Sequence, residues 1–268
     1  MAKVVTEDIH YKDIAYELRD LNNTEQTYKP AEMASALRPM YMNAYSEGIT
    51  EGYENGKQNE HNRFWSTYCS DGTGGDWRRK FANPSWTDEL FDPPFTKIKA
   101  TLYAGSMFQN SGIRNGLKKL TEIDVSETNV SKSSMSNFAN SSLSNYYPIM
   151  KFPAGCDLYL SFAHNTNLVE IEKLVIDETT TFTNTFLSCS RLKNITIEGT
   201  IGQSIDFKDC PLTAASLVSV IEHLSDNAIG ATATFKQSAT NAADWSTTNY
   251  NSWDQLIATK PNWTITLM

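Results

Sequence analysis

Cysteine is scarce in this 268-residue chain, and its placement excludes the structures that cysteine usually builds. The four cysteines, Cys69, Cys156, Cys189 and Cys210, form no C-x-x-C pair and have no histidine partner at the spacing of a zinc site. Zinc modules and disulfide frameworks both depend on such clusters. We therefore expect no metal site and no cofactor, and we interpret the cysteines as buried thiols.

Positive charge and long apolar runs are also limited. The chain has 23 Lys and Arg against 31 Asp and Glu, a formal net charge of -8 that repels nucleic-acid phosphates. We interpret its one dense basic cluster, Arg78-Arg79-Lys80, as a solvated loop edge. No run approaches the roughly 18 apolar residues of a membrane span, and residues 1–9 lack the apolar core of a signal peptide. We expect no nucleic-acid binding, no membrane insertion and synthesis in the cytoplasm without a signal peptide.

Common catalytic motifs are missing as well. The sequence contains no Gly-x-Ser-x-Gly, no phosphate-binding loop and no His-Glu-x-x-His. Glycan hydrolysis needs only two carboxylates about 5 to 10 Å apart. Five carboxylates lie near predicted strands, namely Asp157, Glu170, Glu172, Asp177 and Glu178, but such neighbours arise by chance among 31 acidic residues. We interpret them as solvated surface and predict that the chain is not an enzyme.

Residues 1–70 have a helical pattern. From Met40 to about Tyr68 the pattern is that of one long helix in which glycines recur every four residues. Each glycine costs about 1 kcal/mol relative to alanine, and close approach by another backbone would compensate this cost. We predict a stalk that forms a homo-oligomer, although docking of the helix on its own downstream domain stays open. The predicted contact residues are Tyr45, Gly48, Ile49, Gly52, Tyr53 and Gly56.

Residues 71–100 form a loop-rich, aromatic connector that holds Trp77, Phe81, Trp86 and Phe91. Exposed aromatic rings can stack on sugar rings, whereas buried rings can seal the end of a repeat domain. The sequence favours the second interpretation, an anchor wedge against the first repeat.

A block that repeats five times dominates residues 101–212. In each copy a phenylalanine is followed five or six residues later by an aliphatic residue, and successive phenylalanines are 30, 24, 24 and 21 residues apart. Such spacings are close to the roughly 20 to 29 residues of leucine-rich repeats. The copies are Phe108–Ile113, Phe138–Leu143, Phe162–Leu168, Phe186–Leu192 and Phe207–Leu212.

Alternating apolar residues after several copies predict one short strand per repeat, around Ile123, Ile171 and Ile195. A single repeat cannot bury its own apolar face, so the phenylalanines should stack in one ladder along a solenoid. Cys189 and Cys210 occupy equivalent turns, and we interpret His164 as a turn residue. Residues 213–268 predict an α/β cap that begins with a helix capped by Thr213.

The segment Phe186 to Ile197, F-L-S-C-S-R-L-K-N-I-T-I, resembles the repeat of BspA-type leucine-rich-repeat proteins. The resemblance covers about Phe108 to Leu212 and implies an irregular leucine-rich-repeat solenoid. The N-terminal segment, with the helix Glu-Gly-Tyr-Glu-Asn-Gly-Lys and Arg63-Phe-Trp-Ser, resembles proteins encoded by phages and prophages of Gram-positive gut bacteria, which are usually tail-associated or uncharacterised. This second resemblance implies a virion protein of the phage tail or baseplate periphery, without catalytic residues.

Together these observations predict an α+β chain with an N-terminal helical stalk, a solenoid with one short strand per repeat and a C-terminal α/β cap. The expected function is a non-enzymatic, phage or prophage tail-associated structural and receptor-binding protein that recognises a host-surface glycan or protein. Its expected partners are other tail or baseplate proteins and its own copies, with a trimer suggested by resemblance to tail fibres. The alternatives are a bacterial surface adhesin with leucine-rich repeats and, less favoured, a tail-borne glycan depolymerase.

Overall fold

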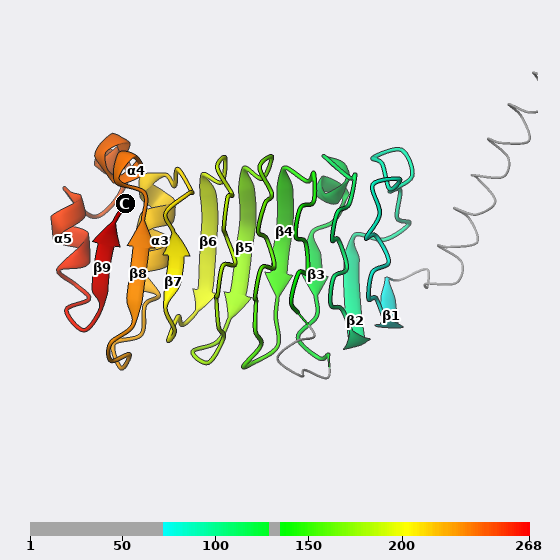
Figure 1. Ribbon diagram of the computed structural model, residues 1–268, viewed down its shortest axis with the longest axis horizontal. Coiled ribbons are helices and arrows are strands. Elements are labelled where there is room, and N and C mark those ends of the chain that lie inside the picture. The colour runs from blue at the N-terminus through cyan, green and yellow to red at the C-terminus, as the bar shows by residue number, and fades with distance from the viewer. Residues whose placement is uncertain (1–71, 129–134) are drawn as a thin grey trace, which may run out of the picture. The chain divides into compact units, whose positions relative to one another are not determined.

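The computed structural model describes residues 72–128 and 135–268, all within the unit Arg63–Met268. These residues form a parallel β-solenoid of about six turns (Figure 1). The predicted stalk and its contact residues, Tyr45, Gly48, Ile49, Gly52, Tyr53 and Gly56, lie outside the described residues. The main sheet of the solenoid has six strands, which are, in spatial order, β1 (Thr73–Asp76), β2 (Lys97–Tyr103), β3 (Glu122–Asp124), β4 (Tyr146–Lys151), β5 (Glu170–Ile176) and β6 (Asn194–Gly199).

Strands β2 to β6 each turn apolar side chains towards the interior, because successive side chains on a strand point to opposite faces. One inward row joins five strands in register: Ile98, Ile123, Met150, Leu174 and Ile197. All five side chains are buried. The strands predicted around Ile123, Ile171 and Ile195 are confirmed as β3, β5 and β6.

Tight turns form the opposite face of the solenoid. Leu160 (φ 53°) and His164 (φ 61°) both adopt the left-handed conformation on either side of Phe162. Their N–H groups donate to carbonyl oxygens of the next coil, at 3.1 Å for Leu160 and 2.7 Å for His164. Successive turns are therefore joined by backbone hydrogen bonds, as strands are. His164 is exposed, so its interpretation as a turn residue is confirmed.

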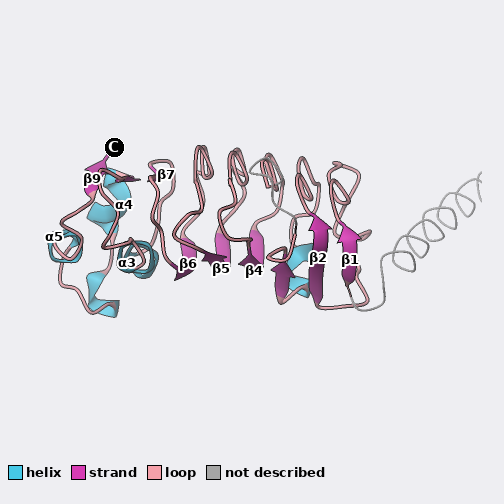
Figure 2. Ribbon diagram, turned by 90° about the horizontal axis from the view of Figure 1, so that it is seen from below, coloured by secondary structure: helices cyan, strands magenta, loops and turns pink. Residues whose placement is uncertain are grey.

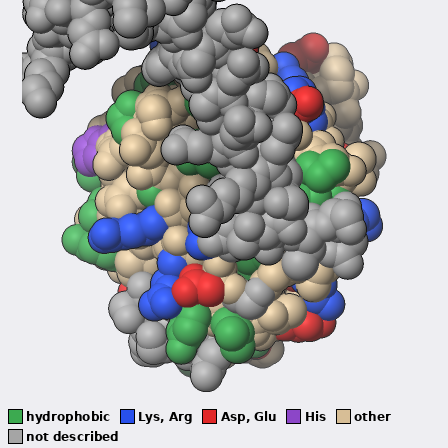
Figure 3. Space-filling view, turned by 90° about the vertical axis from the view of Figure 1, so that its right-hand side faces the viewer, with side chains coloured by type: hydrophobic (Ala, Val, Ile, Leu, Met, Phe, Trp, Pro, Cys, Tyr) green, Lys and Arg blue, Asp and Glu red, His purple; other side chains and the backbone are tan. Residues whose placement is uncertain are grey.

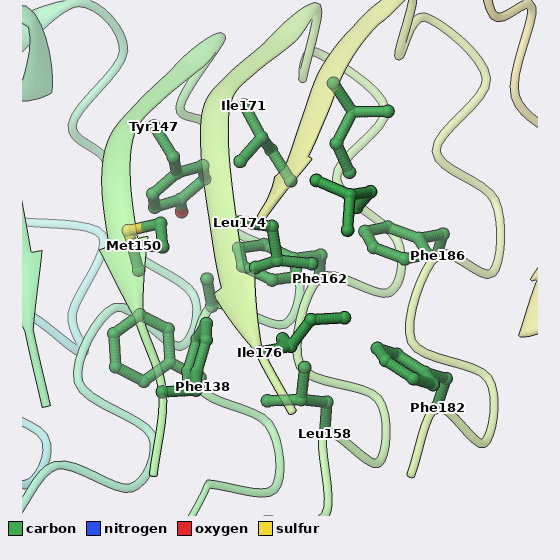
Figure 4. Packing of buried hydrophobic residues seen from close by; sticks show 14 of the residues in the cluster. Phe138, Tyr147, Met150, Leu158, Phe162, Ile171, Leu174, Ile176, Phe182 and Phe186 are labelled. Atoms are coloured by element: carbon green, nitrogen blue, oxygen red, sulfur yellow. The ribbon is translucent and has the colours of Figure 1, made fainter. Parts of the chain in front are cut away.

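Phenylalanine rings run through the interior beneath these turns (Figure 4). Phe186, for example, stacks on Phe162 with ring centroids 5.8 Å apart and on Phe207 at 4.6 Å. The predicted ladder is confirmed and is longer than predicted, since Phe81 and Phe235 extend it at its two ends. The full series is Phe81, Phe108, Phe138, Phe162, Phe186, Phe207 and Phe235.

The alignment of the second repeat on Phe138 is wrong by one residue. Equivalent residues of successive coils can be identified from the backbone bonds of the turns. The N–H of a residue in one coil donates to the carbonyl of the residue just before its equivalent in the next coil. Phe162, for example, donates to Thr185, which precedes Phe186. By the same rule Ala139 donates to Ser161, so Ala139 is the counterpart of Phe162. The ring of Phe138 fills the core from the neighbouring position, which is why the sequence alignment selected it.

The aromatic residues of the 71–100 segment belong to the core. Trp77, Phe81 and Phe91 are fully buried, and Phe81 stacks on Phe108 at 5.1 Å. This confirms the interpretation of a wedge that packs against the first repeat. The same segment includes β1 and the start of β2.

A carboxylate from this segment holds the next coil in place. Both oxygens of Asp88 accept backbone N–H groups, from Arg114, Asn115 and Gly116 at 2.8 to 3.2 Å. These bonds cap η1 (Gly116–Lys119).

Near the C-terminus a helix takes the place of a strand on the main-sheet side, and strands form on the side of the turns. Helix α3 (Ala214–Glu222) follows β6 in the row of the main sheet, while β7 (Ile205–Phe207) and β9 (Thr264–Leu267) lie on the opposite face (Figure 2). The predicted helix cap is confirmed, since the Thr213 side chain accepts from the Ser216 N–H. The remaining elements are β8 (Thr232–Phe235), α4 (Gln237–Ala242), η3 (Trp245–Thr247) and α5 (Trp253–Ile257).

Helix α3 also satisfies the outer edge of β6. The hydroxyl of Ser216 accepts the N–H of Ile195 at 2.9 Å, and that of Ser219 accepts the N–H of Ile197 at 2.8 Å. Two serines three residues apart lie on one side of a helix, so they meet two alternate N–H groups of a strand. The hydroxyls replace the carbonyls that a seventh strand would provide.

Candidate recognition surface

The outward face of the main sheet carries in-register rows of charged side chains, which we call the sheet face. One row runs across the strands in the order Lys99, Asp124, Lys151, Val175 and Glu198. Neighbouring strands are about 4.8 Å apart, so Lys99, Asp124 and Lys151 alternate in charge at that interval, and the apolar Val175 separates them from Glu198. The residues of this row are exposed or partly exposed.

Ion pairs connect neighbouring strands across the sheet face. Glu122 of β3 lies between two lysines, with its carboxylate 3.8 Å from Lys97 Nζ and 2.7 Å from Lys151 Nζ. Lys173 of β5 bonds Glu198 of β6 at 2.7 Å. Exposed pairs contribute only about 0–1 kcal/mol, so their main effect is to hold long side chains in place.

The pKa values of these groups reflect the pairing. The hydrogen bond to Glu122 raises the pKa of Lys151, and the bond from Lys173 lowers the pKa of Glu198. Lys151 and Glu198 therefore remain charged at neutral pH. Tyr146 of β4 completes the series by donating its hydroxyl to Glu172 of β5.

Two aliphatic side chains occupy the middle of the sheet face. Ile149 of β4 and Val175 of β5 both point outward, and both are partly exposed. Ile149 is in register with Lys173, and Val175 with Lys151, so the two are diagonal neighbours, with Cα atoms about 7–8 Å apart. An apolar centre with a charged rim is the usual arrangement of a binding surface.

Two open clefts lie near the C-terminal elements. The first has a volume of about 480 Å³ and is floored by alanines, including Ala214 and Ala239, with Lys193 and Asp244 at its border. The second, about 440 Å³, is more polar and lies beside Glu178. Neither cleft has an aromatic side chain in its lining.

Four of the five carboxylates considered for glycan hydrolysis hold structural bonds. Asp157 accepts from Thr181 Oγ1 at 2.7 Å, and Glu178 accepts from the Ser225 hydroxyl. Asp177 accepts the Gly155 N–H at 3.0 Å and the Thr180 hydroxyl at 2.9 Å. Glu172 accepts from Tyr146, as described above. The fifth, Glu170, is partly exposed on β5.

Burial makes the pKa of Asp177 higher, but bonds from Gly155, Thr180 and Thr179 outweigh that effect, so its pKa is lowered. A carboxyl with a lowered pKa is ionised at neutral pH and is a poor general acid. Asp177 is therefore better explained as a loop-stabilising group than as a proton donor.

The basic cluster also has a structural setting. Arg78 and Arg79 are exposed, which confirms the solvated loop edge. Arg78 bonds Asp76 at 2.7 Å, and its guanidinium lies 4.2 Å from the centre of the Tyr103 ring. Viewed from the β1 end, the described surface shows basic side chains (blue) and acidic side chains (red) next to one another (Figure 3).

The described cysteines all lie in the interior of the solenoid. Cys156, Cys189 and Cys210 are buried and free, as predicted, and Cys69 lies outside the described residues. Ile149, Val175 and the lysines of the sheet face were not identified from the sequence. The signal for them is weak, because in Tyr146–Lys151 buried and partly exposed residues do not alternate strictly.

No group of three or more His, Cys, Asp or Glu in residues 72–128 and 135–268 could hold a metal ion. Within the same two ranges, no helix has the length and apolar character needed to cross a membrane. Comparisons with models of protein families, with curated proteins and with solved structures found no match.

Proposed function

We propose that this chain is a non-enzymatic structural and receptor-binding protein of a phage or prophage tail, which recognises a host-surface glycan or protein through its sheet face. In this proposal the repeats are an irregular leucine-rich-repeat solenoid, and residues 213–268 form its cap. The observation that carries the proposal is the sheet face itself. Its charged side chains are held in register around Ile149 and Val175.

Preorganised side chains favour binding, because less conformational entropy is lost when a partner arrives. The lysine and carboxylate groups can bond hydroxyl and amide groups of a ligand, while the two aliphatic side chains exclude water at the centre. The structural bonds of Asp157, Asp177 and Glu178 support a role without catalysis.

The proposal is tested with the full chain on an array of bacterial cell-envelope glycans and on intact host cells. We compare Val175→Arg, at the centre of the sheet face, with Thr183→Arg, an exposed residue of the turns. The expected result is binding by the parent chain and by Thr183→Arg, with at least a tenfold loss for Val175→Arg. Equal loss in both variants would refute the sheet face as the binding surface. Absence of binding to glycans and cells alike would refute receptor recognition.

Oligomerisation is proposed to occur through Tyr45, Gly48, Ile49, Gly52, Tyr53 and Gly56, with a trimer as the expected state. Light scattering on the full chain should give three times the chain mass of 30.1 kDa. The variant Ile49→Asp should give a lower mass without loss of the solenoid's circular dichroism. A monomeric parent chain would contradict assembly through these residues.

A further inference from the structure

A row of five small polar side chains runs through the solenoid interior. Each stands three residues after the ladder residue of its coil, which here is Phe108, Ala139, Phe162, Phe186 or Phe207. The N–H of each member donates to the carbonyl of its own ladder residue, at 2.9 to 3.3 Å. Each side chain is at most 1% exposed. The members of this row, in order, are Ser111, Ser142, Asn165, Cys189 and Cys210.

Most members of this row have a partner for the side chain as well. The thiol of Cys189 donates to the Phe162 carbonyl at 3.0 Å, one coil earlier. The hydroxyl of Ser142 bonds that of Ser144 at 3.2 Å. Asn165 differs, because neither its Nδ2 nor its Oδ1 has a hydrogen-bond partner in the protein.

By the rule that Cys189 follows, the carbonyl available to Asn165 would be that of Ala139, the ladder residue one coil earlier. No hydrogen bond joins the two. An amide can donate two hydrogen bonds and accept two, so a fully buried amide without partners carries a large unmet capacity.

A second unsatisfied group enters the same region from β4. Tyr147 is fully buried, and its hydroxyl also lacks a hydrogen-bond partner (Figure 4). Burial raises its pKa, while Ser142 and Ser144 are close enough to act in the opposite direction and Cys189 adds to the increase. Ser142 and Cys189 are the members of the row before and after Asn165. The Tyr147 ring also lies 5.3 Å from the ring of Phe162, whose carbonyl accepts the Asn165 N–H, so Tyr147 packs against the coil that holds Asn165.

We propose that an ordered water molecule is bound inside the solenoid between the side-chain amide of Asn165 and the hydroxyl of Tyr147. Water both donates and accepts, and buried waters typically make about three hydrogen bonds to otherwise unsatisfied polar groups. The neighbours of the site in this row are neutral hydroxyls and thiols, which suit a neutral ligand better than an ion. The hydroxyls of Ser142 and Ser144 lie beside Tyr147 and can supply a third bond.

The test is a crystal structure of the full chain at a resolution that resolves ordered water. The expected result is a density peak about 2.7–3.2 Å from an amide atom of Asn165 and from Tyr147 Oη. A direct hydrogen bond between Asn165 and Tyr147, or a region without such a peak, would overturn the proposal.

The variant Asn165→Cys supplies a matched comparison, because it copies the residues of the next two positions in the row. Its thiol can donate to the preceding carbonyl, as that of Cys189 does. We expect the variant to fold and its crystal structure to lack the peak. A peak that persists unchanged would show that other groups hold the water and would overturn the role of Asn165.

Discussion

Truncation of Phe186 is the most direct test of the phenylalanine ladder. A buried aromatic side chain covers roughly 150–250 Å². At about 25 cal/mol per Å² this area corresponds to about 4–6 kcal/mol, and Phe→Ala changes in protein cores cost about 3–5 kcal/mol. Phe186 is 1% exposed and stacks on a ring on each side. We therefore expect Phe186→Ala to lower the free energy of unfolding by about 3–5 kcal/mol.

A second variant separates ring stacking from burial. Phe186→Leu keeps most of the apolar area but loses two aromatic pairs, each worth about 0.5–1.5 kcal/mol, so its expected cost is about 1–3 kcal/mol. Urea unfolding of the full chain, followed by circular dichroism, measures both values. Tyr159→Ala is the control, because that ring is 40% exposed and its loss should change stability by no more than about 0.5 kcal/mol. A cost below about 1 kcal/mol for Phe186→Ala would refute a packed ladder.

Three further predictions concern the backbone, a carboxylate and a thiol. Gly199→Ala should lower the melting temperature far more than Gly230→Ala. Both glycines have positive φ, but only at Gly199 would an added Cβ meet a backbone atom, the carbonyl oxygen of Ile176 at 1.9 Å. Equal shifts in melting temperature would contradict this clash. Burial makes the pKa of Asp88 higher, but three N–H bonds lower it below the ordinary value of 3.8. Its contribution to stability should therefore be present above its unfolded pKa and lost as the pH falls through its folded pKa, and Asp88→Asn should flatten this acid dependence in a series of urea titrations. Burial raises the pKa of Cys189 to about 12, so a disulfide reagent at pH 8 should modify this thiol only when the chain unfolds; rapid modification of the native protein, located by mass spectrometry, would contradict its burial.

The sequence predicted the solenoid because its strongest signals are side chains that repeat at structurally equivalent places. Phe162 and Phe186 are 24 residues apart, and both stack in the core where the period places them. The sequence alignment was wrong at Phe138, because a phenylalanine there stands one residue before the position that is equivalent to Phe162. Only the backbone bonds between coils identify Ala139 as the counterpart of Phe162.

The change of secondary structure on both sides after β6 was not predictable from the repeat. Phe207 continues the ladder but lies in β7, and Phe235, in β8, has no repeat motif after it. The sheet face was missed for a different reason. Lys151 and Glu122 pair across strands 29 residues apart, and a pattern search along the chain does not reveal a contact that depends on register between coils.

The serines of α3 also affect how copies of this protein associate at high concentration. An open strand edge recruits other strands, and regular parallel sheets are especially prone to growing into fibres. At β6 the N–H groups of Ile195 and Ile197 are already taken by the hydroxyls of Ser216 and Ser219. A hydroxyl on a helix can satisfy one strand but cannot serve as the template for another. In the described residues the main sheet therefore ends at β6 on this side, and we expect this edge not to recruit a strand from another copy.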